Sequence, residues 1–469
     1  MNVLDLFDRS SSRFILPDGT TVTCATIRER GCGLATRWRA DGLAPGDRVA
    51  IWLPNGFTYL EVLVACAAGR FVAVSVNTRF SLAEARALIA RSGAKVVVDA
   101  DWSRPVAPGD TIELEPPESV DPFIVFTTSG TTSRPKMVLH TQGSIAVHGR
   151  DAAVGLGYTA DDVVLLTMPL CGTFGLSSLT AALAANSTIV VEDHFDAGET
   201  AGRIVRHRIT AVNGSDDMYH RLLLGGADLS TIRLGGYARF NSSLEGIVAR
   251  AEQAGATVTG LYGMSEVQAL FSARDPSGPA SWRSLAGGAM VSADAAFRIV
   301  DGELWLRGPS LFRGYLAEGG DGIDTELTEA AFTDGWFRTG DVAEGPAESD
   351  ARNRTFTYIT RMGDALRLGG FLVSPAEVEQ RVLEVPGVDQ ALVVAVDLPT
   401  GARPVAFVVA PEGVDEAAVI SHCEANLARY KVPVKVIALD AFPFTPSANG
   451  NKIQNAKLRE MAAEALRSS

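Results

Sequence analysis

The sequence predicts an α/β fold: a large N-terminal domain of mostly parallel sheets flanked by helices, and a small mobile C-terminal α+β domain. Strand and helix patterns alternate over residues 21–100 and again over 161–240, which is typical of β-α-β units. A turn, a Gly-Gly pair and Ser-Pro within 357–380 indicate a hinge. We therefore expect one domain at residues 1–363 and a second at 364–469.

The first expected sheet comes from the alternation before residue 100. Ile27, Leu34 and Trp38 fall on one face of a helix. The other segments are strands at 48–53, 71–76 and 95–99 and helices at 57–69 and 82–93. Because such sheets bind ligands beyond the carboxyl ends of their strands, we expect the site there.

Later segments repeat these patterns. Residues 101–120 are rich in proline and acid and indicate a surface connection. Strand patterns follow at 122–126, 163–170, 187–193 and 231–240, with a helix at 177–185. Beyond the hinge, strands are expected at 390–397, 403–411 and 434–439 and a helix at 417–430. These last segments predict the small domain.

Composition limits the partners of this chain. Its 469 residues are 46% hydrophobic and 21% charged, which is ordinary globular composition. Lys and Arg total 42 against 55 Asp and Glu, so the net charge is −13, and the basic residues form no block. Nucleic acid and anionic membrane surfaces are therefore excluded as expected partners.

Cysteine usage and hydropathy indicate the compartment. The cysteines are odd in number and lack metal-ligand spacing, which suits reduced thiols: Cys24, Cys32, Cys66, Cys171 and Cys423. The N-terminus lacks the pattern of a secretory signal. The most apolar window, residues 62–76, is too short to span a bilayer and contains Arg70. We expect a soluble cytoplasmic protein with no membrane span.

A hydroxyl-rich segment follows the apolar strand at 122–126. Residues 127–133 carry six hydroxyls and one glycine, and Lys136 follows shortly after. Backbone N–H groups, hydroxyls and a lysine can together bind a phosphate, although a solvated turn is the alternative. The segment is not a Walker loop, because Pro135 stands where that pattern, counted from Gly130, requires its second glycine.

This segment resembles the phosphate loop of the adenylate-forming superfamily, which includes acyl-CoA synthetases, peptide-synthetase adenylation domains and luciferases. The family pattern is Thr-Ser-Gly-Thr-Thr-Gly-x-Pro-Lys-Gly, and Ser133 and Met137 replace two of its glycines. A required positive φ would strain Ser133. The resemblance implies ATP binding by Thr128, Ser129, Gly130, Thr131, Thr132 and Lys136, with Thr128 also at the metal.

A second segment, residues 259–268, resembles the family pattern Tyr-Gly-x-Thr-Glu. The resemblance implies that Tyr262 and Gly263 border the purine, that Ser265 meets the α-phosphate and that Glu266 binds Mg²⁺. By itself the segment is more typical of core packing beside a solvated acid. Because the segment follows the phosphate loop in the order of the family motifs, we favour its interpretation as part of the ATP site.

Two further segments resemble family motifs. Residues 336–344 contain Thr-Gly-Asp, which implies that Asp341 accepts the ribose hydroxyls of ATP. Residues 357–380 imply that Arg361 contacts ribose or phosphate and that Asp364 is the hinge, although Thr360 and Gly363 depart from the pattern. The pair Gly369 and Gly370 is implied to line the pantetheine channel of coenzyme A.

The implied acyl pocket combines three segments: Gly172, Phe174, Tyr237 and Gly263. Gly172 takes the place of a family histidine within residues 169–175, which are otherwise typical of a glycine-rich turn. Gly236 is implied to lie against adenine, and the Tyr237 ring either stacks on the base or narrows the acyl tunnel. Asp216 and Asp217 precede a helical pattern, which favours a helix cap over a pocket carboxylate.

The C-terminal segment 443–460 resembles the family motif that carries a catalytic lysine, with Asn451 inserted before Lys452. The resemblance implies that Lys452 is catalytic. Lys457 is the alternative, and its pattern favours a surface charge on a helix.

Together the motifs imply a carboxylic acid:CoA ligase that uses ATP, Mg²⁺ and coenzyme A and forms an acyl-adenylate, releasing pyrophosphate and AMP. One alternative is a stand-alone adenylation enzyme that loads a carrier-protein thiol, and another is a non-catalytic nucleotide sensor. The expected partners are a small carboxylic acid and CoA, and the expected state is a monomer or homodimer. The sequence does not identify the acid.

Overall fold

The computed structural model describes residues 1–469 apart from 104–112, 129–134, 241–243, 245, 321, 351–352, 365, 369–370, 399–400, 448–449 and 468–469. A six-stranded sheet has the order β17-β7-β6-β4-β3-β5, in which β6, β4, β3 and β5 are parallel. Strands β7 and β17 are antiparallel additions. Its strands are β3 (Arg48–Ile51), β4 (Val72–Ser75), β5 (Val96–Val98), β6 (Pro122–Thr127), β7 (Met137–Thr141) and β17 (Gly314–Tyr315).

A larger sheet has the order β15-β16-β19-β20-β14-β13-β12-β11-β10-β8-β9-β1-β2, with β18 beside β19. Its parallel part is β12 (Val258–Met264), β11 (Leu234–Ala238), β10 (Ala211–Ser215), β8 (Val163–Leu166), β9 (Thr188–Val191) and β1 (Arg13–Ile15), and β2 (Thr21–Thr23) is antiparallel to β1. The rest is antiparallel: β13 (Gln268–Ala273), β14 (Gly287–Met290), β15 (Ala296–Val300), β16 (Glu303–Arg307), β18 (Phe332–Thr333), β19 (Trp336–Glu344) and β20 (Thr355–Arg361).

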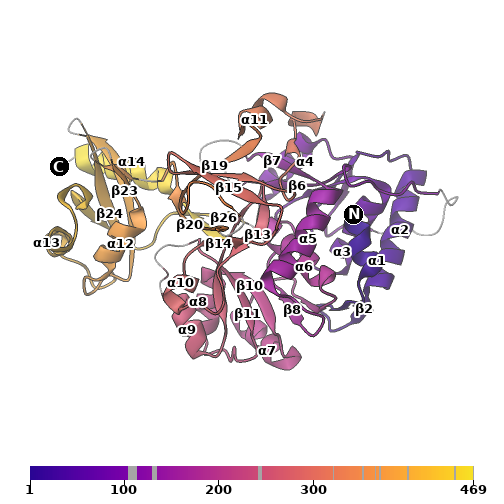
Figure 1. Cartoon of the computed structure of the whole chain (residues 1–469), viewed down its shortest axis with the longest axis horizontal. Coiled ribbons are helices and arrows are strands. Elements are labelled where there is room, and N and C mark those ends of the chain that lie inside the picture. The colour runs from indigo at the N-terminus through magenta and orange to yellow at the C-terminus, as the bar shows by residue number, and fades with distance from the viewer. Residues whose placement is uncertain are drawn as a thin grey trace.

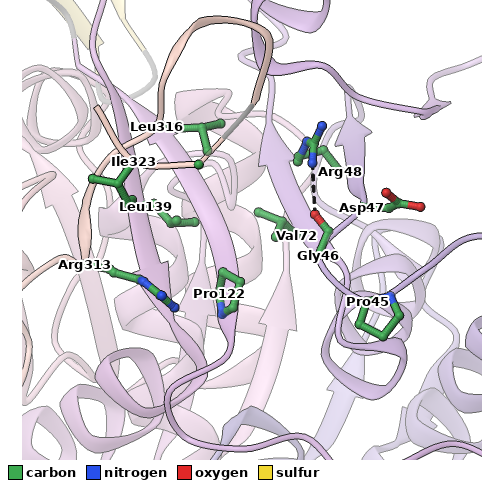
Figure 2. A pocket seen from close by; sticks show the side chains of 11 residues that line it. Pro45, Gly46, Asp47, Arg48, Val72, Pro122, Leu139, Arg313, Leu316 and Ile323 are labelled. Carbon is green, nitrogen blue, oxygen red and sulfur yellow. Dashed lines mark hydrogen bonds between the residues drawn. The ribbon is translucent and has the colours of Figure 1, made fainter. Parts of the chain in front are cut away.

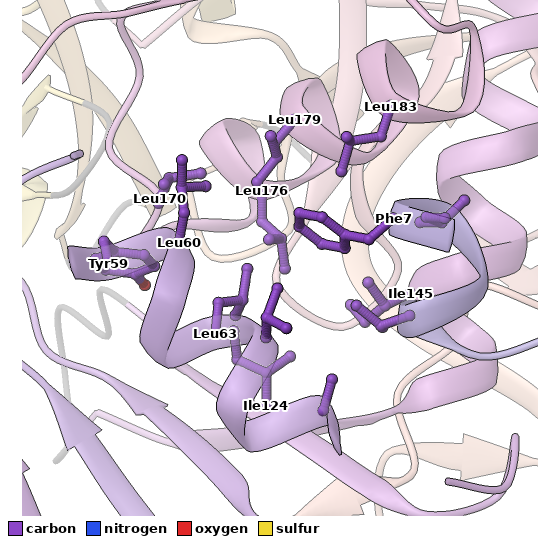
Figure 3. Packing of buried hydrophobic residues seen from close by; sticks show 14 of the residues in the cluster. Phe7, Tyr59, Leu60, Leu63, Ile124, Ile145, Leu170, Leu176, Leu179 and Leu183 are labelled. Atoms are coloured by element: carbon purple, nitrogen blue, oxygen red, sulfur yellow. The ribbon is translucent and has the colours of Figure 1, made fainter. Parts of the chain in front are cut away.

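Helices cover both sheets because strand residues alternate between faces. On β4, Val72 and Val74 pack on the side of α4, whereas Ala73 packs on the side of α3. Figure 3 shows side chains of α3 and α6 meeting between the sheets. The helices are α1 (Val3–Arg9), α2 (Cys24–Ala40), α3 (Phe57–Gly69), α4 (Leu82–Ser92), α5 (Gln142–Leu156), α6 (Thr173–Ala184), α7 (Ala197–His207), α8 (Asp216–Leu224), α9 (Ile247–Gln253), α10 (Ala280–Arg283) and α11 (Thr325–Glu329). The α/β fold class is confirmed.

Most of the C-terminal elements, among them α12, α13, α14, β23 and β24, gather on the left of Figure 1, β26 is labelled nearer the middle, and α1 to α3 lie on the right. This region contains two hydrophobic clusters, and all the buried residues of both clusters lie at or after Leu366 in the sequence. The elements are β21 (Leu366–Leu368), β22 (Phe371–Val373), α12 (Pro375–Leu383), β23 (Gln390–Leu398), β24 (Gly401–Val409), α13 (Glu416–Asn426), β25 (Lys435–Ala438), β26 (Phe444–Ser447), β27 (Gly450–Ile453) and α14 (Asn455–Arg467).

A hollow of about 470 Å³ lies at the start of β3 and β6. Figure 2 shows Pro122, Leu139 and Ile323 around it and Arg48, whose Nη1 donates to the carbonyl oxygen of Gly46 at 3.2 Å. Its lining includes none of the residues expected at the ATP site. Within the described ranges, no helix has the length and apolar character needed to cross a membrane.

Candidate active site

The predicted phosphate loop closes an antiparallel hairpin. Strands β6 and β7 pair with Thr127 opposite Met137. Beyond that pair, the Thr128 N–H donates to the Lys136 carbonyl oxygen at 3.0 Å, and the Lys136 N–H donates to Thr128 Oγ1 at 3.1 Å. Two of the predicted ATP-binding residues are thus fixed at the hairpin mouth. Ser129, Gly130, Thr131, Thr132 and the substituted Ser133 lie outside the described residues.

Lys136 and Glu266 are brought together by a residue that the sequence analysis did not single out. The Lys136 Nζ atom lies 4.6 Å from the centroid of the Tyr315 ring. The Tyr315 hydroxyl donates to Glu266 Oε1 at 3.0 Å. Tyr315 and Glu266 are both buried.

The Glu266 carboxylate is suited to a divalent cation. Burial raises the pKa of its carboxyl group, and the Tyr315 hydrogen bond and the nearby Arg361 and Lys136 lower that pKa in part. No three His, Cys, Asp or Glu side chains cluster as a metal site in the part of the chain that the structure describes. Glu266 could hold a magnesium ion together with phosphate oxygens and water, which is how this ion is commonly bound. The Thr128 hydroxyl could serve the same ion.

A buried histidine joins the hairpin to the Glu266 segment. His140 on β7 lies with Nε2 at 2.8 Å from the carbonyl oxygen of Ser265. Burial lowers the pKa of His140 to about 4, so the ring is neutral at pH 7 and its Nε2–H is the donor. The bond ties β7 to the residue preceding Glu266. Sequence reasoning missed His140 because the two residues are 125 positions apart.

The Thr-Gly-Asp motif aims the Asp341 carboxylate inward. Thr339 Oγ1 donates to the carbonyl oxygen of Leu304 at 2.6 Å and accepts the N–H of Asp341 at 3.0 Å. Gly340 has a φ of 68°, a conformation that favours glycine. This turn explains the threonine and the glycine of the motif.

Asp341 is held by two other predicted site residues. The Tyr262 hydroxyl donates to Asp341 Oδ2 at 2.7 Å, and Arg361 Nη1 lies 3.0 Å from Asp341 Oδ1. Strand pairing places Asp341 opposite Arg361. The Tyr262 ring packs edge-on against Phe356, with centroids 5.2 Å apart. The structure therefore brings Tyr262, Asp341 and Arg361 into one cluster.

Gly263 is required by the close approach of two strands. A Cβ atom there would lie 2.5 Å from the carbonyl oxygen of Gln268 and 2.6 Å from the Cα of Ala269. Gly263→Ala should therefore lower the free energy of unfolding by roughly 1–3 kcal/mol, measured by urea denaturation without ligand. Gly33→Ala is the matched control, because it lies on the exposed face of α2 with open space at its Cβ. Equal stability of the two variants would contradict this account.

The residues of the implied acyl pocket lie around α6 and β11. Gly172 is the N-cap of α6, so residues 173–175 form its first turn and are not a separate glycine-rich turn. Phe174 is buried in the core between the sheets. Gly236 faces Asn213, whose Oδ1 would lie 2.0 Å from an added Cβ. Tyr237 is buried on β11 edge-on to Tyr219, with centroids 6.5 Å apart.

The prediction that an aspartate caps α8 is wrong. Ser215 at the end of β10 is the N-cap, and its Oγ accepts the N–H of Met218 at 3.2 Å. Asp216 occupies the first turn, where its carboxylate accepts the N–H of Asp217 at 2.9 Å and that of Phe240 at 2.8 Å. The serine takes the cap because it is the last residue of β10 and stands immediately before the first residue of the helix.

The structure describes only some of the site residues predicted in the C-terminal region. The main chain of Lys452 lies on β27, paired with Thr445, but its side chain is not among those described. Asp364 follows β20, and Arg459 Nη2 on α14 donates to Asp364 Oδ1 at 2.6 Å and to the Gly363 carbonyl oxygen at 2.7 Å. Gly369 and Gly370 lie outside the described residues.

Comparison with known proteins identifies relatives along the whole chain. One relative is a CoA ligase of Mycobacterium tuberculosis whose acyl group is a propanoyl chain bearing a methyl-dioxo-octahydro-indenyl ring system. It is 32% identical, over 95% of this chain and 96% of the relative. A feruloyl-CoA synthase of Amycolatopsis is 29% identical, over 92% of each chain. The o-succinylbenzoate CoA synthetase of Bacillus subtilis, solved with ATP and a magnesium ion, is 25% identical with a TM-score of 0.82, over 97% of this chain and 98% of that one.

Two family models match consecutive parts of the chain. The AMP-binding enzyme model matches residues 8–316, and the model of the AMP-binding enzyme C-terminal domain matches residues 377–449. The matched ranges include the hairpin mouth, the Glu266 segment and most of the C-terminal elements. The chain therefore belongs to the family of AMP-binding, adenylate-forming enzymes.

Proposed function

We propose that the protein is an ATP-dependent ligase that joins a carboxylic acid to coenzyme A through an acyl-adenylate. The observation that carries the proposal is a polar site built from two groups of residues in contact. Tyr262, Asp341 and Arg361 form one part of it, and Glu266 and Lys136 meet through Tyr315 in the other. Arg361 also acts electrostatically on Glu266, which connects the two parts.

In the first step, a carboxylate oxygen of the acid bonds to the α-phosphorus of ATP while the bond to pyrophosphate breaks. Asp341 would accept the ribose hydroxyls, and Lys136 would place positive charge beside the phosphates. Mg²⁺ on Glu266 supplies neutralising charge to the phosphate oxygens when bound. Lys452 would bridge the carboxylate and the α-phosphate. The work of the protein is positioning and electrostatics, without a protein nucleophile.

In the second step, the CoA sulfur bonds to the acyl carbon, AMP leaves with the electron pair of the broken bond, and the thiol proton passes to solvent. We assign residues 1–363 and 364–469 to two domains that rotate about Asp364, which would withdraw Lys452 and bring Gly369 and Gly370 to the cleft. Support comes from the separate hydrophobic clusters that begin at Leu366.

The named relatives guide the choice of substrates. They are CoA ligases whose acids carry rings, so CoA is favoured over a carrier-protein thiol and ring-bearing acids should head any substrate panel. The five cysteines are all free thiols, which supports a cytoplasmic location. A monomer or homodimer is the assembly we propose.

Pyrophosphate exchange tests the function directly. The purified enzyme should exchange labelled pyrophosphate into ATP when the correct acid is present, and should form an acyl-CoA and AMP when CoA is added. Exchange without a CoA ester would identify a carrier-loading enzyme. Absence of exchange across aromatic, alicyclic and medium-chain acids would identify a nucleotide sensor and overturn the proposal.

A further inference from the structure

Tyr315 stands between the two groups of opposite charge that flank the triphosphate site. Its hydroxyl donates to Glu266 Oε1 at 3.0 Å, and its ring lies under the Lys136 ammonium at 4.6 Å. The ring is 2% exposed and packs against Phe312 with centroids 4.9 Å apart. One buried side chain therefore contacts both a carboxylate and a cation.

The position of this ring is fixed by its strand. Tyr315 on β17 pairs with Val138 on β7, which makes Lys136 a diagonal neighbour within reach of an aromatic ring. The Tyr315 N–H donates to Thr328 Oγ1 at 3.0 Å. The same segment also holds the Glu266 main chain, because the Phe312 N–H donates to the Glu266 carbonyl oxygen at 2.8 Å.

We propose that Tyr315 is a positioning residue that orients the Glu266 carboxylate toward the metal and holds the Lys136 ammonium beside the phosphates. The inference rests on the proposed function, because it assumes that these groups meet Mg²⁺ and ATP. The hydroxyl acts on Glu266, and the ring face acts on Lys136 through a cation–π contact. The two effects are separable by substitution: Tyr315→Phe removes only the hydroxyl, and Tyr315→Leu removes the ring as well.

The experiment measures ATP binding by calorimetry, once in EDTA and once with saturating Mg²⁺. The dissociation constant in EDTA divided by the dissociation constant with Mg²⁺ measures how much the metal strengthens ATP binding. The measurement needs no turnover. In Tyr315→Phe this ratio should fall about tenfold, because a hydrogen bond to a charged group is lost. Binding in EDTA should stay within about twofold of wild type. Tyr315→Leu should also weaken binding in EDTA, since Lys136 loses the ring.

A double mutant separates positioning from a general structural role. In the Glu266→Gln background the metal contribution should already be small, and adding Tyr315→Phe should change the ratio no further. Tyr59→Phe is the matched control, because Tyr59 is a buried tyrosine whose hydroxyl lies 3.3 Å from Ser75 Oγ, outside this cluster. It should leave the ratio unchanged.

The outcomes distinguish this inference from the proposed function. Wild-type protein that binds no ATP under either condition would overturn the proposed function. A second outcome is that the wild-type protein binds ATP but Tyr315→Phe leaves the metal contribution unchanged, or weakens binding equally with and without Mg²⁺. This outcome would overturn only the role of Tyr315. Tyr315→Phe carries the test even if Tyr315→Leu fails to fold, because phenylalanine fills the same space.

Discussion

Replacing Lys452 with alanine should lower the rate of ATP–pyrophosphate exchange by roughly 100- to 1,000-fold, the usual cost of removing one preorganised donor from a developing charge. The first half-reaction brings the substrate carboxylate and the α-phosphate together, and their repulsion must be cancelled where they meet. In the proposed second half-reaction Lys452 is withdrawn. Thioester formation from CoA and supplied acyl-adenylate should therefore remain close to the wild-type rate.

Lys457→Ala is the matched control for this prediction. Lys457 lies five residues further along, on α14, and the same motif offers it as the alternative lysine. Its exchange rate should equal that of the wild type. Unchanged exchange in Lys452→Ala would refute the assignment, and loss of exchange in Lys457→Ala alone would transfer the role to that residue.

Replacing Asp341 with alanine should raise the dissociation constant of ATP by about 100-fold or more. The expected loss is that of two hydrogen bonds from ribose hydroxyls to a carboxylate, each worth roughly 1.5–3 kcal/mol. Tyr262 and Arg361 also lose the group that holds them in the ligand-free protein. Calorimetric titration with ATP measures the effect, and Asp341→Asn should lie between alanine and wild type because it keeps one acceptor oxygen.

Asp162→Ala controls for the loss of a buried paired carboxylate. Asp162 is 1% exposed, and its carboxylate accepts hydrogen bonds from Arg233 and from Thr210 Oγ1. It lies immediately before the first residue of β8, outside the site cluster. Both alanine variants should unfold at a lower temperature than the wild type, since each removes the carboxylate that pairs with an arginine. Only Asp341→Ala should weaken ATP binding. Comparable weakening in both variants would show that Asp341 acts through stability alone.

The fold was predictable wherever hydrophobic periodicity determines an element. The helix expected at 57–69 is α3 with the same bounds, and that at 82–93 is α4, which ends at Ser92 with Gly93 as its left-handed cap. The antiparallel half of the large sheet was not predicted. Strands such as β14 and β16 are short, and β16 pairs with β19 across a bulge, so the order of the strands depends on tertiary contacts that no local pattern records.

The site was predictable where a motif supplied both chemistry and order. Asp341, Tyr262 and Arg361 were each named from separate motifs, and the structure brings them together across 79 positions of sequence between Tyr262 and Asp341. Tyr315 and His140 were missed because their importance comes from strand register. Tyr315 meets Glu266 49 positions away, and neither residue belongs to a pattern that implies the other.

The β6–β7 hairpin is paired up to the residues on either side of the segment 129–134. The boundaries of this segment are set by the pairing of Thr127 with Met137 and by the two hydrogen bonds between Thr128 and Lys136. None of these contacts involves a residue of the segment itself. Lengthening a loop costs little, about 0.6 kcal/mol for each doubling. Donor segments from other nucleotide-activating enzymes could therefore be grafted between the same two residues, which would allow phosphate binding to be varied without redesigning the sheet.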